Sequence, residues 1–468
     1  MNVDPVVVEV TTESKSIPID AWPTKELFIR TLVKDIPLNR AILDLIDNSV
    51  DSARELRRNE KYHGLWIHIE MSGSQFKIRD NCKGIPVKEA VRYAFRFGAA
   101  KGKHQVPHSV GQFGVGMKRA LFKMGRHFIV ESATGHSRFI VEEDVDDWTS
   151  RKRDRDWSFS LKKESHLPNI SDSQTGTAIT VSELLEDVQR EFETALFVNA
   201  LCREIAVVHQ FSLTKGLEIK VNDTRVTGEP ASLKFSKLVR PGYIGFSENG
   251  AKQKVKVEMY AGVSDFDARS AGWYVYCNKR LVLKADQTKT TCWGEGSGKK
   301  RIIPQYHPQF AYFRGYLYLD CKNASRLPWN TTKTGLDEDS RVYKDVRQEM
   351  IPLMRGVINW LNDLKEEKDR KPNQEETLEL ERAINEASEA ELAIVRKELR
   401  PKKSGKIWSA PFVGPEPKDV RELTKMITIS YKKPEEEVDQ VKEVLKVKKN
   451  REVGERTFEF YHKRMCKS

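Results

Sequence analysis

Apolar residues recur at helical spacing between Leu38 and Ala53. Because residues three or four positions apart share one side of a helix, one face of this segment is apolar. That face carries Ile42, Leu45, Ile46 and Ser49. A neighbouring edge carries Asp44, Asp47, Asn48 and Asp51. The pattern predicts a helix with a buried face and a row of acidic and amide groups beside it.

Alternating apolar and polar residues predict two strands after this helix, from Leu65 to Met71 and from Gln75 to Asp80. The second strand ends directly on the segment Asp80-Asn-Cys-Lys-Gly84. Farther along, the glycine-rich segment Gly111 to Gly116 opens a helical run that ends at Met124, and Gly176-Thr177 leads into another strand. A polar strand end and two glycine turns are therefore candidate parts of a ligand site.

The order of these patterns predicts an α+β fold with five parts. They are a flexible leader (residues 1–20), a first domain (21–226), a second α/β domain (227–361), a charged helical linker (362–405) and a small β-α-α module (406–468). Within the linker, a solvated connecting helix is favoured over a functional coiled coil, because Glu, Lys, Arg and Ala dominate it.

Composition narrows the class of protein. Of the 468 residues, 32% are charged and 39% hydrophobic, and the mean hydropathy is -0.58. No apolar run approaches the roughly 20 residues of a membrane-spanning helix, and the N-terminus lacks a signal-peptide pattern. We therefore expect a cytoplasmic protein with no membrane partner. The six cysteines form no CxxC pair, so we expect them to be reduced and without a metal.

The net charge favours a polyanionic partner. Lysine and arginine number 80 and aspartate and glutamate 68, which leaves a surplus of 12 positive charges. The sequence pI is about 9.2. A basic balance of this kind makes nucleic acid the favoured partner.

Three motifs together carry a candidate chemistry. Asn48 and Asp44, one helical turn apart, offer an amide oxygen for Mg²⁺ and a carboxylate that can deprotonate water. Asp80 can accept a hydrogen bond from an exocyclic amine such as that of adenine, and Gly84 leaves room for the ring. Backbone N–H groups near the glycines and the helix that follows can hold phosphates; these glycines are Gly111, Gly114 and Gly116. Each motif alone is also compatible with a solvated helix face or a helix cap, but their order suits Mg-ATP.

These motifs resemble those of the GHKL ATPase superfamily, which includes gyrase B subunits, the ninety-kilodalton heat-shock chaperones, histidine kinases and MutL. Residues 44–53 resemble the N-box, residues 80–84 the DNGxG motif, residues 111–116 the GQFGVG form of the chaperone branch and Gly176-Thr177 the GT motif. The resemblance implies a Bergerat ATP-binding sandwich followed by a transducer domain, with ATP and Mg²⁺ as ligands.

The resemblance also implies residue roles. Asp44 occupies the position of the family's general base, and Asn48 occupies the position of its magnesium ligand. Asp80, Gly84 and Thr177 fall at the adenine, and Gly111, Gly114, Val115 and Gly116 at the phosphates. Residues 96–110 correspond to the ATP lid.

A lysine from the second domain reaches the γ-phosphate in two-domain members, and Lys333 in Asn330-Thr-Thr-Lys-Thr is the preferred candidate here. The alternative is Lys289, in a literal Gln-Thr-Lys sequence. The sequence departs from the family motifs at two positions. Asp44 replaces the usual glutamate of the gyrase and MutL branches, which predicts slow turnover, and Cys82 replaces the first glycine of DNGxG.

Within residues 406–468, the order and lengths of the elements from Ile427 onward resemble a ribbon-helix-helix module. The strand would run from Ile427 to Tyr431, two helices would follow, and two copies would pair into a homodimer. Thr428, Ser430 and Lys432 are then the candidates for contact with DNA. A module that only dimerises remains the alternative.

Together these features predict a slow ATP hydrolase that acts as an ATP-dependent dimerisation switch on or near DNA. The architecture resembles MutL- or MORC-like ATPases of bacterial restriction or phage-defence systems, with a separate nuclease or effector partner. The alternatives are a non-hydrolysing nucleotide sensor or scaffold and a chaperone-like ATPase. A histidine kinase is disfavoured because no phospho-acceptor helix with a suitable histidine is found.

Overall fold

The computed structural model describes residues 19, 23–98, 106–111, 114–151, 156–164, 175–249, 254–296, 302–370, 379–417 and 429–466. Contacts divide the chain into two units. One unit combines Met1–Lys365 with Thr377–Pro417, and the other combines Glu366–Glu376 with Lys418–Ser468. Each unit is described by itself below.

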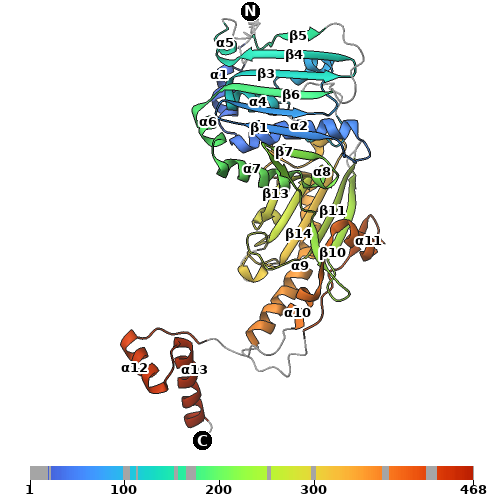
Figure 1. The fold of residues 1–468 in the computed structure, drawn as a ribbon. Coiled ribbons are helices and arrows are strands. Elements are labelled where there is room, and N and C mark those ends of the chain that lie inside the picture. Colours follow the sequence, from blue (N-terminus) through green and yellow to red (C-terminus); the bar gives the residue numbers. More distant parts are fainter. Residues whose placement is uncertain are drawn as a thin grey trace, which may run out of the picture. The chain divides into compact units, whose positions relative to one another are not determined.

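The first unit begins with an eight-stranded sheet in the order β5-β4-β3-β6-β2-β1-β7-β8 (Figure 1). Neighbouring strands are antiparallel except β1 and β7, which are parallel. The strands are β1 (Trp66–Met71), β2 (Gln75–Asp80), β3 (Gly125–Thr134), β4 (Ser137–Asp144), β5 (Leu161–Glu164), β6 (Gly176–Leu184), β7 (Glu218–Val221) and β8 (Thr224–Val226).

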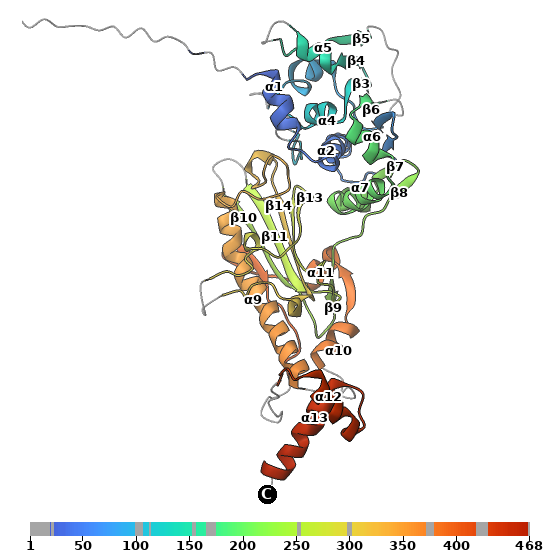
Figure 2. The same cartoon turned by 90° about the vertical axis from the view of Figure 1, so that its left-hand side faces the viewer.

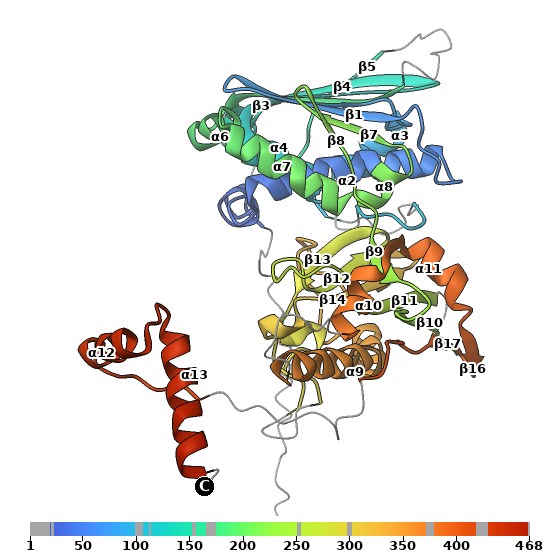
Figure 3. The ribbon, with the colours of Figure 1, turned by 60° about the horizontal axis from the view of Figure 1, so that its bottom comes forward.

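Helices cover one face of this sheet (Figures 2 and 3). The longer ones are α2 (Leu38–Leu56), α4 (Gly116–Met124) and α7 (Ala195–Val208). Shorter ones are α1 (Lys25–Leu27), α3 (Val87–Glu89), α5 (Val145–Ser150), α6 (Glu186–Phe192) and α8 (Gln210–Thr214). The strand pair and the helices predicted at 38–53 and 117–124 are confirmed, with small shifts at their ends.

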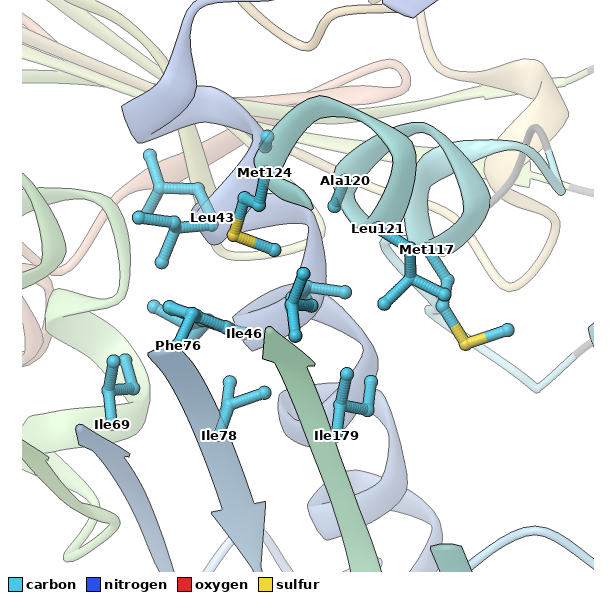
Figure 4. Close-up of a cluster of buried hydrophobic side chains, with 14 of the residues drawn as sticks. Leu43, Ile46, Ile69, Phe76, Ile78, Met117, Ala120, Leu121, Met124 and Ile179 are labelled. Atoms are coloured by element: carbon cyan, nitrogen blue, oxygen red, sulfur yellow. The ribbon is translucent and has the colours of Figure 1, made fainter. Parts of the chain in front are cut away.

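The core between helices and sheet explains why α2 forms where it does. Its apolar face is fully buried and packs with α4 against the central strands (Figure 4). Leu43 and Ile46 of α2 meet Phe76 and Ile78 of β2 in this layer. Burying that face holds the acidic edge of α2 at a fixed distance from the strand end at Asp80.

A second sheet of seven strands follows in the order β13-β12-β14-β11-β10-β17-β16. The strands are β10 (Gly242–Asn249), β11 (Lys254–Val263), β12 (Gly272–Cys277), β13 (Arg280–Asp286), β14 (Phe313–Asp320), β16 (Lys402–Ser404) and β17 (Ile407–Ala410). Figure 2 shows α9 (Arg341–Arg370) on one face and α11 (Leu392–Leu399) with β9 (Ser232–Phe235) on the other. The mixed α/β architecture agrees with the predicted fold class at this coarse level.

The boundaries predicted for residues 362–405 and 406–468 need correction. Residues 341–370 form the continuous helix α9, and α10 (Glu379–Glu386) buries Leu380 and Ile384 in the core beside it. β15 (Ser388–Glu391) pairs with β9, while β16 and β17 extend the second sheet. The abundance of charged residues hid these short elements, because only one side of each is apolar. Residues 379–410 are therefore part of the second sheet's layers, not a separate linker.

The second unit contains the two helices predicted near the C-terminus, α12 (Glu435–Leu445) and α13 (Asn450–Tyr461). The predicted strand at 427–431 is not observed for Ile429–Tyr431, and residues 427 and 428 lie outside the described residues. Since a ribbon strand pairs only with a second copy, the ribbon-helix-helix assignment stays a prediction. Among the described helices, none has the length and apolar content needed to cross a bilayer.

The correction at α10 is testable by core truncation. Leu380→Ala should lower the free energy of unfolding by about 2–5 kcal/mol, because the buried side chain leaves a cavity. Chemical denaturation followed by circular dichroism measures the change. Ile394→Ala, at an exposed position of α11, is the matched control and should change little. Equal, small effects of both variants would mean that α10 is a solvated linker helix.

Candidate functional site

A hollow of about 250 Å³ lies along the acidic edge of α2. Its lining includes every residue that the sequence suggested for ATP, metal and catalysis: Asp44, Asn48, Asp80, Gly84, Gly111, Gly114, Val115, Gly116, Thr177 and Lys333. These residues come from α2, the end of β2 and the segment after it, the glycine turn and the start of α4, β6 and the loop after β14. The fold thus brings together residues that lie almost 290 positions apart in the chain.

Asp80 forms one end of the hollow. Its Oδ2 accepts a hydrogen bond from the Ser49 hydroxyl at 2.7 Å, and its Oδ1 accepts from the backbone N–H groups of Cys82 (2.9 Å) and Thr177 (3.3 Å). Burial raises the pKa of Asp80, while these hydrogen bonds oppose the rise. The carboxylate is therefore held in one orientation, with its remaining acceptor capacity available to a ligand.

Beside Asp80, the backbone at Gly84 lies close to the backbone of β3 at Ala133. Gly84 has a φ of +74°, and a side chain there would place its Cβ 2.0 Å from the carbonyl oxygen of Ala133. Cys82 needs no such freedom: it lies outside the positive-φ residues, and its side chain is fully buried in the core. The cysteine that replaces a glycine of the resembled motif is therefore accommodated without backbone strain.

Asp44 lies at the opposite end between two cations. Its Oδ2 accepts a hydrogen bond from Arg119 Nη2 of α4 at 2.8 Å, and its Oδ1 accepts one from Lys333 Nζ at 3.0 Å. All three side chains are buried. The Asp44 carboxyl group lies 3.2 Å from the Cβ position that a side chain at Gly116 would occupy, so a larger residue there would crowd the carboxylate.

Asp47, one turn from Asp51 and next to Asn48, is the most heavily paired carboxylate of α2. Arg280 Nε contacts both of its oxygens at 2.8 and 2.9 Å, and Lys333 Nζ donates to Oδ2 at 2.6 Å. Burial alone would raise the pKa of Asp47, but the cations Arg280 and Lys333 outweigh it and hold that pKa well below its ordinary value.

Two side chains near Asp47, those of Lys333 and His209, are buried with it and also have shifted pKa values. Burial would lower the pKa of Lys333, yet Asp47 and Asp44 reverse this and raise it, so the lysine is charged at neutral pH. Burial lowers the pKa of His209, which lies 3.5 Å from Asp47, to about 3. His209 is therefore neutral, and the ion cluster consists of two carboxylates and three cations: Asp44, Asp47, Arg119, Arg280 and Lys333.

Asp51 holds the chain at 106–111 against α2. Its carboxylate accepts hydrogen bonds from the N–H groups of Val110 and Gly111, each at 2.8 Å. Arg54 donates to the carbonyl oxygens of His108 and Asn278, at 3.0 and 2.8 Å. The end of the predicted lid is thereby joined to both α2 and the second sheet. Residues 99–105 of the lid and 112–113 of the glycine turn lie outside the described residues.

The side chain of Asn48 is exposed within the hollow, as a metal ligand would need to be. The described residues contain no group of three His, Cys, Asp or Glu side chains that could hold a metal alone. This donor set suits Mg²⁺ bound by one protein oxygen together with phosphate and water oxygens.

The other candidates lie elsewhere. Lys289 is exposed in a short helix and does not line the hollow. Ser430 and Lys432 are exposed in the second unit, and Thr428 lies outside the described residues.

Sequence reasoning assigned no role to Asp47, Asp51, Arg119 or Arg280. The first two stood on the predicted acidic edge, and Arg119 stood in the predicted helix after the glycine turn, so a search for buried charges on those elements could have found them. Arg280 gave no local signal, because its partner Asp47 is 233 residues away.

Comparison with known families agrees with this site. Residues 36–177 match the family model described as Histidine kinase-, DNA gyrase B-, and HSP90-like ATPase. No curated protein matches the chain. The matched part is thus similar to ATPase domains of the GHKL superfamily, and the match supports ATP binding there and, at the level of the family, ATP hydrolysis.

The ion cluster predicts a measurable coupling. Asp47→Asn and Arg280→Met should each lower the free energy of unfolding by about 3–5 kcal/mol, because each leaves a buried charge without its partner. The double variant should lose much less than the sum. Urea denaturation of the four proteins gives the coupling energy. Glu386→Gln, which breaks the exposed pair with Arg382, is the control and should change stability little; additive losses at Asp47 and Arg280 would contradict the pairing.

Proposed function

We propose that the chain binds Mg-ATP in the hollow beside α2, hydrolyses it slowly, and uses the nucleotide state as a dimerisation switch on or near DNA. The single observation that carries the proposal is the position of Lys333. This lysine comes from the loop after β14, yet its ammonium group lies in the same hollow as Asp44, Asn48 and the glycine turn.

The adenine end is assigned to Asp80, Gly84 and Thr177. The fixed carboxylate of Asp80 would accept a hydrogen bond from the exocyclic amine, and Gly84 keeps the floor free of a side chain. Val115 and the glycines 111, 114 and 116 would offer N–H groups to the phosphates, where the N-terminus of α4 adds its positive end. Asn48 is the protein ligand proposed for Mg²⁺, which would neutralise phosphate charge.

Lys333 supports the switch. In the structure it is bonded to Asp44 and Asp47. A triphosphate places additional negative charge next to these carboxylates, and only its γ-phosphate distinguishes it from a diphosphate. Transfer of the Lys333 ammonium to that phosphate would report ATP to the second sheet, and it would also leave Asp44 with one cation instead of two.

Asp44 is the proposed general base, which would take a proton from the attacking water. Two features favour slow turnover: its side chain is one methylene shorter than glutamate, and Arg119 and Lys333 both bond to it. The same contacts favour the second candidate function, a nucleotide sensor that does not hydrolyse ATP, because each oxygen of the Asp44 carboxylate is already bonded to a cation.

Dimerisation is supported by the second unit. Among the described residues of its two helices and their connection, the buried apolar side chains are Val453 of α13 and Val447 of the connection, while Val444, Phe458 and Tyr461 are exposed. So small a unit needs a partner to cover its apolar side chains, and a second copy of the chain suits the ribbon-helix-helix pattern. Thr428, Ser430 and Lys432 remain the proposed DNA contacts of that module. A separate nuclease or effector in a restriction or phage-defence system is proposed by analogy of architecture.

The role of Lys333 is tested by nucleotide affinity. Lys333→Met should weaken ATP binding at least about tenfold and leave ADP binding almost unchanged, because only ATP has the γ-phosphate that the lysine would contact. Isothermal titration with a non-hydrolysable ATP analogue and with ADP measures both constants. Lys289→Met is the matched control from the alternative Gln-Thr-Lys sequence. If Lys289→Met loses the ATP preference and Lys333→Met retains it, the assignment is wrong.

Native mass spectrometry of the same proteins tests the switch itself. Wild type should form a larger assembly with the ATP analogue and Mg²⁺ than with ADP, and Lys333→Met should not. Identical masses in all nucleotide states would contradict a dimerisation switch.

The role of Asp44 is tested by turnover. Asp44→Asn should bind the ATP analogue yet reduce phosphate release at least about a hundredfold, because general-base catalysis contributes about 10²–10⁴-fold. Asp44→Glu should raise the rate above wild type by restoring the longer side chain. If wild type releases no more phosphate than Asp44→Asn, the non-hydrolysing sensor is the correct function.

A further inference from the structure

The second sheet carries a hollow of about 430 Å³, and its lining includes Arg396 of α11. Because α11 and α9 lie on opposite faces of the sheet (Figure 2), the hollow is on the face opposite α9. Its lining residues come from β10, β11, α11, β16 and β17 and from the turn between β16 and β17. The strands β10, β17 and β16 form one edge of the sheet, and Figure 3 shows α11 near them. We call this hollow the basic hollow and define it by Lys254, Lys256, Arg396, Lys403, Lys406 and Trp408. None of these residues belongs to the nucleotide hollow beside α2.

Strand register places the centre of the basic hollow. Lys403 is opposite Trp408, Trp408 is opposite Gly245, and Gly245 is opposite Glu258. Directly opposed residues of antiparallel strands point to the same face of a sheet. The row therefore runs across four strands, with a tryptophan and a lysine at its outer end. Gly245 carries no side chain in the middle of this row, and the Tyr243 side chain covers it, since a Cβ there would lie 2.2 Å from the Tyr243 hydroxyl.

Positive charge dominates this face. Residues 396–406 contain six lysines and arginines and one acid, Glu398. The acid on the floor of the basic hollow, Glu258, is already bonded to Arg396 and lies 3.4 Å from Lys256. Lys254, Lys403 and Lys406 form no ion pair within the described part of the chain. Three exposed cations thus surround one hollow without an acidic partner, which favours an anionic ligand with several charges.

Trp408 identifies the kind of polyanion. Its side chain is 47% exposed, and the Lys403 ammonium lies 5.7 Å from its ring. Lysines alone on an edge strand are explained by protection against edge-to-edge pairing, but that protection does not need an exposed tryptophan. A tryptophan face flanked by lysines is the arrangement that stacks an unpaired base while the lysines hold the adjoining phosphates.

We propose that the basic hollow binds single-stranded nucleic acid, with a base stacked on Trp408 and phosphates on Lys254, Lys403 and Lys406. This inference rests on the proposed function only because both take nucleic acid as the partner. It adds a contact with nucleic acid on the second sheet to the one proposed for the C-terminal module. Duplex nucleic acid fits less well, because its bases are already stacked on one another.

Fluorescence anisotropy of the full-length chain tests the proposal. The probes are a labelled single strand of mixed sequence, its duplex with the complementary strand, and inorganic polyphosphate as a competitor without bases. Wild type should bind the single strand tightest. Trp408→Ala should weaken that binding about tenfold, while Trp408→Phe should retain most of it, and Phe266→Ala, an exposed aromatic elsewhere on the second domain, should have no effect.

Charge is tested separately by salt dependence. Lys403→Gln/Lys406→Gln should reduce the slope of log affinity against log salt by about 1.4, because each phosphate contact on a single strand contributes about 0.7. Lys284→Gln is the matched control, since Lys284 is exposed on β13 at the other edge of the same sheet. Equal binding of duplex or polyphosphate, or unchanged binding by Trp408→Ala, would overturn the proposal.

The same samples are also tested for binding of a fluorescent ATP analogue. This measurement separates the proposal for the basic hollow from the proposed ATP site. All these variants should bind the analogue as wild type does, because the basic hollow and the nucleotide hollow share no residue. Normal ATP binding without single-strand binding by wild type would overturn this inference and leave the ATP site intact. Loss of ATP binding alone would overturn the proposed function.

Discussion

The pairing of buried Asp47 with Arg280 and Lys333 is the interaction on which the rest of the structure depends. Asp47 is fully buried, and an unpaired carboxylate in that position would cost several kcal/mol. Both cations come from the second sheet and its loops. The charged Asp47 carboxylate of α2 is therefore stable in its buried position only while Arg280 and Lys333 pair with it. The two sheets are coupled through α2 in this way.

The coupling extends along α2 in both directions. One turn before Asn48, Asp44 shares Lys333 with Asp47, and one turn after Asp47, Asp51 holds the N–H groups of Val110 and Gly111. Val110 is itself buried in the core of the second sheet. One edge of α2 thus carries the proposed base and contacts both the proposed γ-phosphate lysine and the end of the predicted lid. A ligand that breaks one of these contacts would therefore change the electrostatic environment of the others.

Much of this arrangement could be predicted from local pattern. Helical spacing gave α2, alternation gave β1 and β2, and the glycine turn located α4, because each signal is contained within about twenty residues. Arg280 could not be predicted, since a charged residue at the start of a strand resembles any surface residue until its distant partner is known. Residues 379–410 were misassigned for a related reason: Leu380 and Ile384 reach a core that their Glu- and Lys-rich surroundings conceal.

A crystal structure of the chain with a non-hydrolysable ATP analogue and Mg²⁺ tests the role of Lys333 most directly. Lys333 Nζ should leave Asp44 and contact the γ-phosphate, while Arg280 should remain paired with Asp47. A complex in which Lys333 still bonds to both carboxylates, with the γ-phosphate held by other residues, would contradict this role.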